Sequence, residues 1–228
     1  MTPTCILGKA INHGPDTGLG FDAFSACPEE GLYALCDGAN SCPDSGQAAL
    51  WLCQQITDAQ VPKDQHLNFG PLVRELHEHM LVSFPNTAAT LVGLHVAPWG
   101  LRLVSVGDSE LTVYKRGWWG RGPWQKNCTM PKDLDTDGHP RQLIASDVLD
   151  TVHQLDLPAQ GTWLALMMSD GPARVLTASV LQKTLQKISQ RTPSSEDLDY
   201  LCQTLANEAL SSGCQDDVSV AMLWIQYG

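Results

Sequence analysis

The hydrophobic and polar positions along the chain predict a mixture of strands and amphipathic helices. Short continuous apolar runs bounded by Gly, Pro, Asp or Asn are typical of buried strands, whereas apolar residues spaced by three and four predict helices. We expect strands at residues 6–10, 31–36, 87–96, 101–106, 110–114, 152–157, 163–168 and 218–225. We expect helices at residues 45–59, 70–83, 172–189 and 195–210.

Two connections between these elements have distinctive compositions. Gly107-Asp108-Ser109 separates two apolar runs by three residues, so we expect a β-hairpin there. Residues 127–146 are polar and rich in turn-forming residues, which predicts a mobile connection over the surface. The chain has 228 residues, and this length predicts one large domain over residues 1–228.

An unusual aromatic segment follows the predicted hairpin. Residues 116–124 hold Trp118, Trp119 and Trp124 among Gly and Arg. Aromatic residues and Arg are enriched at protein interfaces, but a hairpin tip that folds back onto the body has the same composition. The segment is therefore either packed on the domain or a surface for a protein partner.

Composition and charge exclude several functional classes. A formal charge of -11 argues against a nucleic-acid-binding surface, which needs a basic footprint. No apolar run is long enough to span a membrane, and the N-terminus has no signal-peptide pattern, so we expect a cytoplasmic protein. The eight cysteines include no Cys-x-x-Cys pair, which indicates reduced thiols rather than a zinc site or a disulfide framework.

Aspartates recur where the predicted strands end. Asp37, Asp108 and Asp170 each follow a buried strand in an Asp-Gly or Gly-Asp turn, and Asp216 comes just before the last strand. Asp22 stands between two phenylalanines, and an enclosed carboxylate needs a partner. The pattern predicts that these carboxylates gather at one edge of a sheet.

Gathered carboxylates predict a site for divalent cations. Two carboxylates about 5 Å apart repel by roughly 3 kcal/mol at an effective dielectric constant near 20. Carboxylate oxygens suit Mg²⁺ or Mn²⁺, and the scarcity of His and Cys near these turns argues against zinc. Two such ions can activate a shared water and bind phosphoryl oxygens, which points to a phosphate-ester hydrolase. The sequence contains neither a Gly-x-Ser-x-Gly motif nor a Walker phosphate loop.

Six segments of the chain carry a family resemblance: Asp22, YALCDGAN (33–40), TAATLVGLHV (87–96), LRLVSVGDSELTVY (101–114), LALMMSDG (164–171) and GCQDDVSVAML (213–223). Taken in order, they resemble the metal-dependent serine/threonine protein phosphatases of type 2C, the PPM family, in their short bacterial form. The resemblance implies an α+β fold, a four-layer α-β-β-α sandwich of two antiparallel sheets flanked by helices. It also implies that residues 127–146 form a flap beside the active site.

The resemblance also implies roles for individual residues. Asp37 would bridge two Mn²⁺ or Mg²⁺ ions and Asp22 would act at the second ion, mostly through water, so both are expected to be catalytic. Asp108 corresponds to a residue that helps to hold a third, weaker ion. The full set of expected metal ligands is Asp22, Asp37, Gly38, Asp108, Asp170 and Asp216.

Several positions depart from the family pattern. Thr17 stands where the family has an Arg that binds the substrate phosphate, so Lys9 or Arg174 is expected to supply that charge. Arg174 replaces an Asp that is common in the family, so the pattern does not decide whether a third ion binds. Asp217 stands where Asn is usual.

Two functions follow from this pattern. The first is metal-dependent hydrolysis of phosphoserine or phosphothreonine in phosphoproteins by a hydroxide that bridges the two ions, in partnership with a cognate kinase. The alternative is a catalytically weak or inactive module of the same fold that binds a phosphoprotein or a signalling partner. The missing Arg and the Trp-rich segment motivate the alternative, whereas the retained aspartates favour the enzyme.

Overall fold

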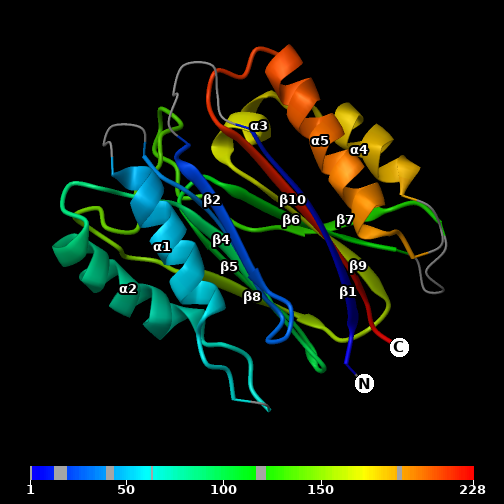
Figure 1. Ribbon diagram of the computed structural model, residues 1–228, viewed down its shortest axis with the longest axis horizontal. Coiled ribbons are helices and arrows are strands. Elements are labelled where there is room, and N and C mark those ends of the chain that lie inside the picture. The colour runs from blue at the N-terminus through cyan, green and yellow to red at the C-terminus, as the bar shows by residue number, and fades with distance from the viewer. Residues whose placement is uncertain (1, 13–19, 40–43, 63, 117–121, 189–191) are drawn as a thin grey trace.

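Two antiparallel five-stranded sheets lie face to face between two layers of helices (Figure 1). The computed structural model describes residues 2–12, 20–39, 44–62, 64–116, 122–188 and 192–228. The expected α+β four-layer sandwich is confirmed.

One sheet has the strand order β2-β3-β4-β5-β8. Its outer face is covered by α1 and α2 (Figure 1). The strands are β2 (Asp22–Cys27), β3 (Leu32–Asp37), β4 (Leu91–Ala97), β5 (Gly100–Val106) and β8 (His153–Pro158), and the helices are α1 (Ser45–Thr57) and α2 (Phe69–Ser83).

The other sheet has the strand order β1-β10-β9-β6-β7. Helices α3, α4 and α5 lie on its outer side (Figure 1). The strands are β1 (Thr4–Asn12), β10 (Val218–Gln226), β9 (Thr162–Met168), β6 (Glu110–Lys115) and β7 (Gln125–Thr129), and the helices are α3 (Asp170–Val175), α4 (Ala178–Lys187) and α5 (Ser195–Ser211).

Strand alternation places apolar side chains in three layers. In β3, Leu32, Ala34 and Cys36 pack beneath α1 and α2, whereas Tyr33 and Leu35 pack between the two sheets. Because successive side chains of a strand point to opposite faces, both faces of these strands are buried. This explains why they appear in the sequence as continuous apolar runs.

The expected hairpin at residues 107–109 is wrong. Strand β5 belongs to one sheet and β6 to the other, so Gly107-Asp108-Ser109 crosses between the sheets. Gly107 has φ +88, and an added Cβ would lie 2.9 Å from Thr90 Cγ2. A strand that is buried on both faces gives no sequence signal for which sheet it joins.

Other boundaries also differ from the expectation. The single helix predicted at 172–189 is two helices, α3 and α4, because Leu176 is extended (ψ 118) and the Thr177 hydroxyl accepts a hydrogen bond from Val180 N. Helix α5 begins at Ser195 as expected, with Ser194 as its N-cap, and ends at Ser211. Strands β2 and β7 were not predicted.

The segment 127–146 is anchored at its ends. Met130 and Ile144 are buried, and Ile144 pairs with Ala89 in an isolated bridge. Asp133 N donates to Gly107 O over 3.0 Å, while residues 135–139 are exposed. The segment therefore contributes to the core at its ends and covers the surface only in its middle.

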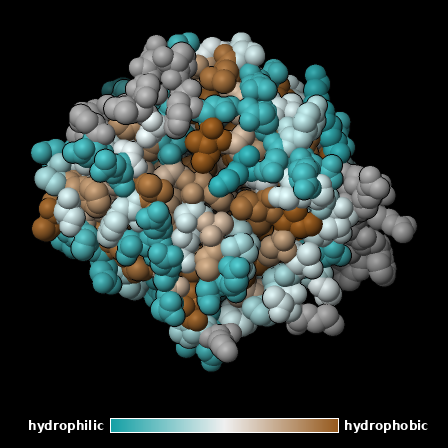
Figure 2. All heavy atoms as spheres, viewed as in Figure 1, coloured by the Kyte–Doolittle hydropathy of each residue, from teal (hydrophilic) through white to brown (hydrophobic). Residues whose placement is uncertain are grey.

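The exposed face, the helices and the cysteines each bear on the composition of the chain. Hydrophilic residues cover much of the face seen in Figure 2, and hydrophobic residues gather toward its middle. None of the helices in the described part of the chain is long and apolar enough to cross a membrane. The structure describes seven free cysteines: Cys5, Cys27, Cys36, Cys53, Cys128, Cys202 and Cys214.

Candidate metal and active site

Asp22 and Asp37 face each other across the first two strands of one sheet. They are register partners in the antiparallel β2–β3 pair. Asp37 follows Tyr33 and Leu35 in the alternation of β3, so it lies on the face that meets the second sheet. Directly opposed residues of an antiparallel pair have Cβ atoms about 4.5–5.5 Å apart, and like charges there are destabilising.

The second sheet and the crossover bring three further carboxylates to this end of the inter-sheet layer. Asp170 begins α3 directly after β9, Asp216 precedes β10, and Asp108 lies in the β5–β6 crossover. Gly171 permits the close approach of α3, because an added Cβ would lie 2.6 Å from Asp217 O and 3.2 Å from Asp216 Cβ. The charges of Asp22, Asp108, Asp170 and Asp216 all act on Asp37.

A hydrogen-bond network fixes the backbone around Asp37. Its N–H donates to Thr90 Oγ1 over 3.1 Å, and Thr90 N donates to Asp37 O over 2.8 Å. Thr90 Oγ1 also lies 2.6 Å from Ser109 Oγ, which ties Asp37 to the crossover. The next residue must be Gly38, because an added Cβ would lie 2.4 Å from Ser45 O.

The electrostatics of this end favour a bound cation. Burial, and then the negative charges of Asp22, Asp170, Asp216 and Asp108, raise the pKa of Asp37 well above its ordinary value. Burial raises the pKa of Asp22 to about 7, although the nearby hydroxyls of Ser169 and Ser219 lower it. Burial and Asp108 likewise raise the pKa of Asp170 to about 6, and Arg174 opposes that shift. Carboxylates with raised pKa values are stabilised in their charged form by nearby cations.

The Asp22 carboxylate provides a test of whether a cation fits. Both of its oxygens are buried and neither has a hydrogen-bond partner of normal geometry, and an ionised carboxylate left this way is costly. Within the described ranges, no three His, Cys, Asp or Glu side chains are already arranged to hold one ion. The chemistry of the donors, all of them carboxylate or carbonyl oxygens, nevertheless suits Mg²⁺ or Mn²⁺.

Two charged residues beside the carboxylates have clear partners. Arg174 Nη2 lies 2.7 Å from Asp170 Oδ2 and 3.1 Å from Asp108 Oδ2. The buried Asp217 accepts a hydrogen bond of 2.6 Å from Phe21 N, which holds the residue before Asp22. An acidic residue at 217 is visible in the sequence, but nothing in the local pattern indicates this positioning role.

Lys9, the other expected phosphate-binding residue, lies on β1. Its ammonium group is 5.3 Å from the centroid of the Phe24 ring, two residues along β2 from Asp22. Its backbone N–H donates to Asp199 on α5. Thr17 lies outside the described residues.

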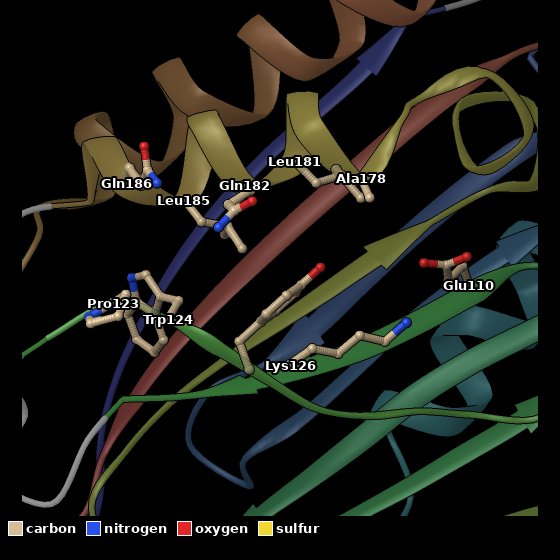
Figure 3. A pocket seen from close by; sticks show the side chains of 10 residues that line it. Glu110, Pro123, Trp124, Lys126, Ala178, Leu181, Gln182, Leu185 and Gln186 are labelled. Carbon is tan, nitrogen blue, oxygen red and sulfur yellow. The ribbon is translucent and has the colours of Figure 1, made fainter.

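Trp124 lines a pocket of about 270 Å³ between α4 and strands β6 and β7. Figure 3 shows its ring below α4, near Leu185 and Gln186. The Arg116 guanidinium lies 4.6 Å from the centroid of that ring. Trp124 is therefore partly packed on the domain, whereas Trp118 and Trp119 lie outside the described residues. None of the five clustered aspartates lines this pocket.

No protein-family model and no curated protein sequence matches the chain. Solved structures do match over nearly its full length. The catalytic domain of the serine/threonine protein phosphatase PstP, in complex with two manganese ions, is 17% identical, with a TM-score of 0.74 over 99% of this chain and 100% of that one. The serine/threonine phosphatase Stp1 from Staphylococcus aureus is 13% identical, with a TM-score of 0.76 over 100% and 97%. PppA, a regulatory component of the T6SS in Pseudomonas aeruginosa, is 14% identical, with a TM-score of 0.75 over 98% and 97%.

The chain has the fold of the bacterial serine/threonine phosphatases. The resemblance to the type 2C phosphatases is therefore confirmed for the fold. Within this phosphatase fold, Asp22, Asp37, Asp108, Asp170 and Asp216 lie at one end of the inter-sheet layer, as the strand-end pattern predicted. Their assignment as metal ligands remains a prediction.

Proposed function

We propose that the chain is a metal-dependent phosphatase that hydrolyses phosphoserine or phosphothreonine in phosphoproteins. The observation that carries the proposal is the pair of buried Asp22 oxygens, which have no hydrogen bond of normal geometry and lie with four further carboxylates at one end of a phosphatase fold. Carboxylates enclosed in this way need cations. The manganese ions of PstP support Mn²⁺ as one of those cations.

In this proposal, Asp22, Asp37, Asp170, Asp216 and the Gly38 carbonyl hold two divalent cations. Bound cations of this kind activate a water and neutralise phosphoryl oxygens. The β2–β3 pairing fixes Asp22 against Asp37, and the contact of Gly171 with residues 216 and 217 fixes Asp170 against Asp216. The two sheets therefore each contribute a preorganised pair of carboxylates.

The substrate phosphate needs a positive group near the carboxylates. Arg174 is half-exposed, and its contacts with Asp108 and Asp170 use only Nη2. Its remaining N–H groups suit a phosphate oxygen, because a guanidinium has five donors in a fixed plane. Lys9 is the second candidate, at the exposed edge of β1.

The proposal also covers the substrate, the compartment, a flap and a protein partner. The substrate is a phosphoprotein that a cognate serine/threonine kinase modifies, and the compartment is the cytoplasm. The middle of 127–146 serves as a flap beside the carboxylates, because Asp133 joins this segment to Gly107 next to Asp108. The proposal also includes a protein partner that binds at Trp118, Trp119 and Trp124.

A binding module without turnover is the second candidate. It is favoured by Arg174, which already neutralises part of the acidic cluster, and by the absence of a preformed three-donor arrangement among the described residues. Such a module would bind a phosphoprotein or a signalling partner at the same end of the fold.

Hydrolysis assays separate the two candidates. We expect release of phosphate from p-nitrophenyl phosphate and from a phosphothreonine peptide with Mn²⁺ or Mg²⁺, and its loss with EDTA. If calorimetry detects Mn²⁺ binding but no phosphate is released from either substrate, the binding module is the better account. If the chain neither binds Mn²⁺ nor releases phosphate, the proposed metal site is wrong.

A further inference from the structure

Arg174 places one guanidinium nitrogen between carboxylates from two different elements. Nη2 is 2.7 Å from Asp170 Oδ2, one helical turn earlier on α3, and 3.1 Å from Asp108 Oδ2 in the β5–β6 crossover. The two carboxylate side chains are only 13% and 7% exposed, whereas the Arg174 side chain is 55% exposed. A charge at the surface thus meets two largely buried carboxylates.

This arrangement performs the electrostatic task of a bound ion. Asp108 and Asp170 repel each other at close range, and burial strengthens that repulsion because it reduces solvent screening. A guanidinium stays protonated at every pH that the protein meets. Since it is covalently attached, its occupancy does not depend on the concentration of free cations.

A divalent ion between these two carboxylates would compete with Arg174. Both Oδ2 atoms are already within hydrogen-bonding distance of Nη2. An ion at that place would lie beside a fixed positive charge and would have to displace it. Arg174 approaches Asp170 at Oδ2, which leaves Oδ1 to serve an ion on the side of Asp37 and Asp216.

We propose that Arg174 is a tethered cation that replaces a dissociable divalent ion between Asp108 and Asp170. The carboxylate cluster then binds at most two divalent ions, and Asp108 binds neither of them. The ion count rests on the proposed metal-dependent function, whereas the stabilising role of Arg174 rests on the ion pairs alone. The two parts are therefore tested separately.

The first experiment measures stability without metal. In EDTA at pH 7.5, Arg174→Ala should lower the melting temperature by about 2–4 °C, because Asp108 and Asp170 lose their shared counter-charge. Adding Asp108→Asn should recover much of that loss, because the repulsion disappears with the second charge. Lys183→Ala removes the same charge from the surface of α4 and should leave the melting temperature unchanged. The proposal is overturned if Arg174→Ala has the melting temperature of the wild type, or if adding Asp108→Asn to Arg174→Ala does not raise the melting temperature.

The second experiment counts ions. Titration with Mn²⁺, followed by calorimetry and by the electron paramagnetic resonance of free Mn²⁺, should give at most two ions per wild-type chain. Arg174→Ala and Arg174→Asp should each bind one more, weaker ion, and Arg174→Lys should keep the wild-type count because it keeps the charge. Three ions on the wild type, or no additional ion on either charge-removing variant, would overturn the proposal.

The two experiments also distinguish this inference from the proposed function. If the wild type binds no Mn²⁺ but Arg174→Ala gains one ion, the tethered cation is supported and the two-ion enzyme is not. If the wild type binds two ions and Arg174→Ala binds the same two, the metal site stands and the tethered cation is wrong.

Discussion

Asp37 is the residue on which the carboxylate cluster converges. Burial, and then the charges of four other aspartates, raise its pKa, so the folded chain without cations holds its negative charge at a cost. A carboxylate with a raised pKa stabilises the fold below its unfolded pKa and loses that contribution as the pH rises through the folded value. For neighbouring Asp22 that value is about 7. The metal-free protein should therefore lose stability as the pH rises from about 4 to about 7.

Asp37→Asn tests this repulsion directly. In EDTA at pH 7.5 the variant should melt about 2–4 °C above the wild type, because one of the mutually repelling charges is gone. Differential scanning calorimetry measures the shift. The exposed Asp147 provides a matched control, and Asp147→Asn should change nothing. A melting temperature below that of the wild type would mean that the Asp37 charge is already compensated within the chain.

Two substitutions of Asp217 distinguish its hydrogen bond to Phe21 from its negative charge. It accepts a hydrogen bond from Phe21 N and its charge raises the pKa of Asp22. Asp217→Asn keeps an acceptor oxygen and should retain stability, whereas Asp217→Ala leaves a buried N–H without its acceptor and should cost about 1–3 kcal/mol in urea unfolding. Equal effects of the two substitutions would show that the hydrogen bond to Phe21 is unimportant.

At the scale of elements, α5 supports the sheet that carries Asp170 and Asp216. Its N-terminus has a complete capping box, in which the Ser194 side chain accepts from Asp197 N and the Asp197 side chain accepts from Ser194 N. Leu198, Leu201 and Leu205 of this helix pack on the outer face of the sheet. The cap therefore fixes where the helix begins relative to that apolar face.

Ser194→Ala should destabilise the fold by about 1 kcal/mol because N3 loses its acceptor. Urea unfolding measures this effect, and metal binding should remain unchanged because the carboxylates lie elsewhere. Ser212→Ala, at the exposed C-terminal cap, should have almost no effect. A loss from Ser212→Ala as large as that from Ser194→Ala would contradict the capping argument.

The elements also show what the sequence could predict. The apolar run that ends at Asp37 identified β3 and the position of its carboxylate, because a continuous apolar run and an Asp-Gly turn are local signals. The crossover at Gly107 was mistaken for a hairpin, since both faces of β5 are buried and local pattern does not specify the sheet. The contact between Arg174 and Asp170 follows from helical spacing, whereas its contact with Asp108 depends on that crossover. Strand β2 was missed because its residues are only partly buried.

At the scale of the whole molecule, protonation of His95 on β4 should make the stability of the fold depend on acid pH. His95 is buried and accepts a hydrogen bond from Leu67 N at Nδ1. Burial, His66 and Arg102 lower its pKa to about 4, and a backbone hydrogen bond with Glu30 opposes them. An unfolded histidine titrates near pH 6.5, so the unfolded chain binds more protons between about pH 6.5 and 4. The free energy of unfolding should fall as the pH decreases through that range.

The part of the free energy of unfolding that is lost through His95 should reach about 3 kcal/mol below about pH 4. Urea unfolding of the wild type and of His95→Asn, at pH 7 and at pH 5, measures this loss. The opposite effect of the carboxylate cluster is present in both proteins and cancels in the comparison. Asn retains an acceptor for Leu67 N but does not titrate, so its unfolding free energy should fall less on acidification. Equal losses in the two proteins would contradict the assignment.

The central claim is that the carboxylate end of the sandwich is a metal-dependent phosphatase site. The most direct measurement is the rate of phosphate release from a phosphothreonine peptide in Mn²⁺, for the wild type and Asp37→Asn purified side by side. We predict Mn²⁺-dependent release by the wild type and a rate at least about 100-fold lower for Asp37→Asn, with Asp147→Asn unaffected. Release that persists in EDTA, or near-normal turnover by Asp37→Asn, would contradict the account.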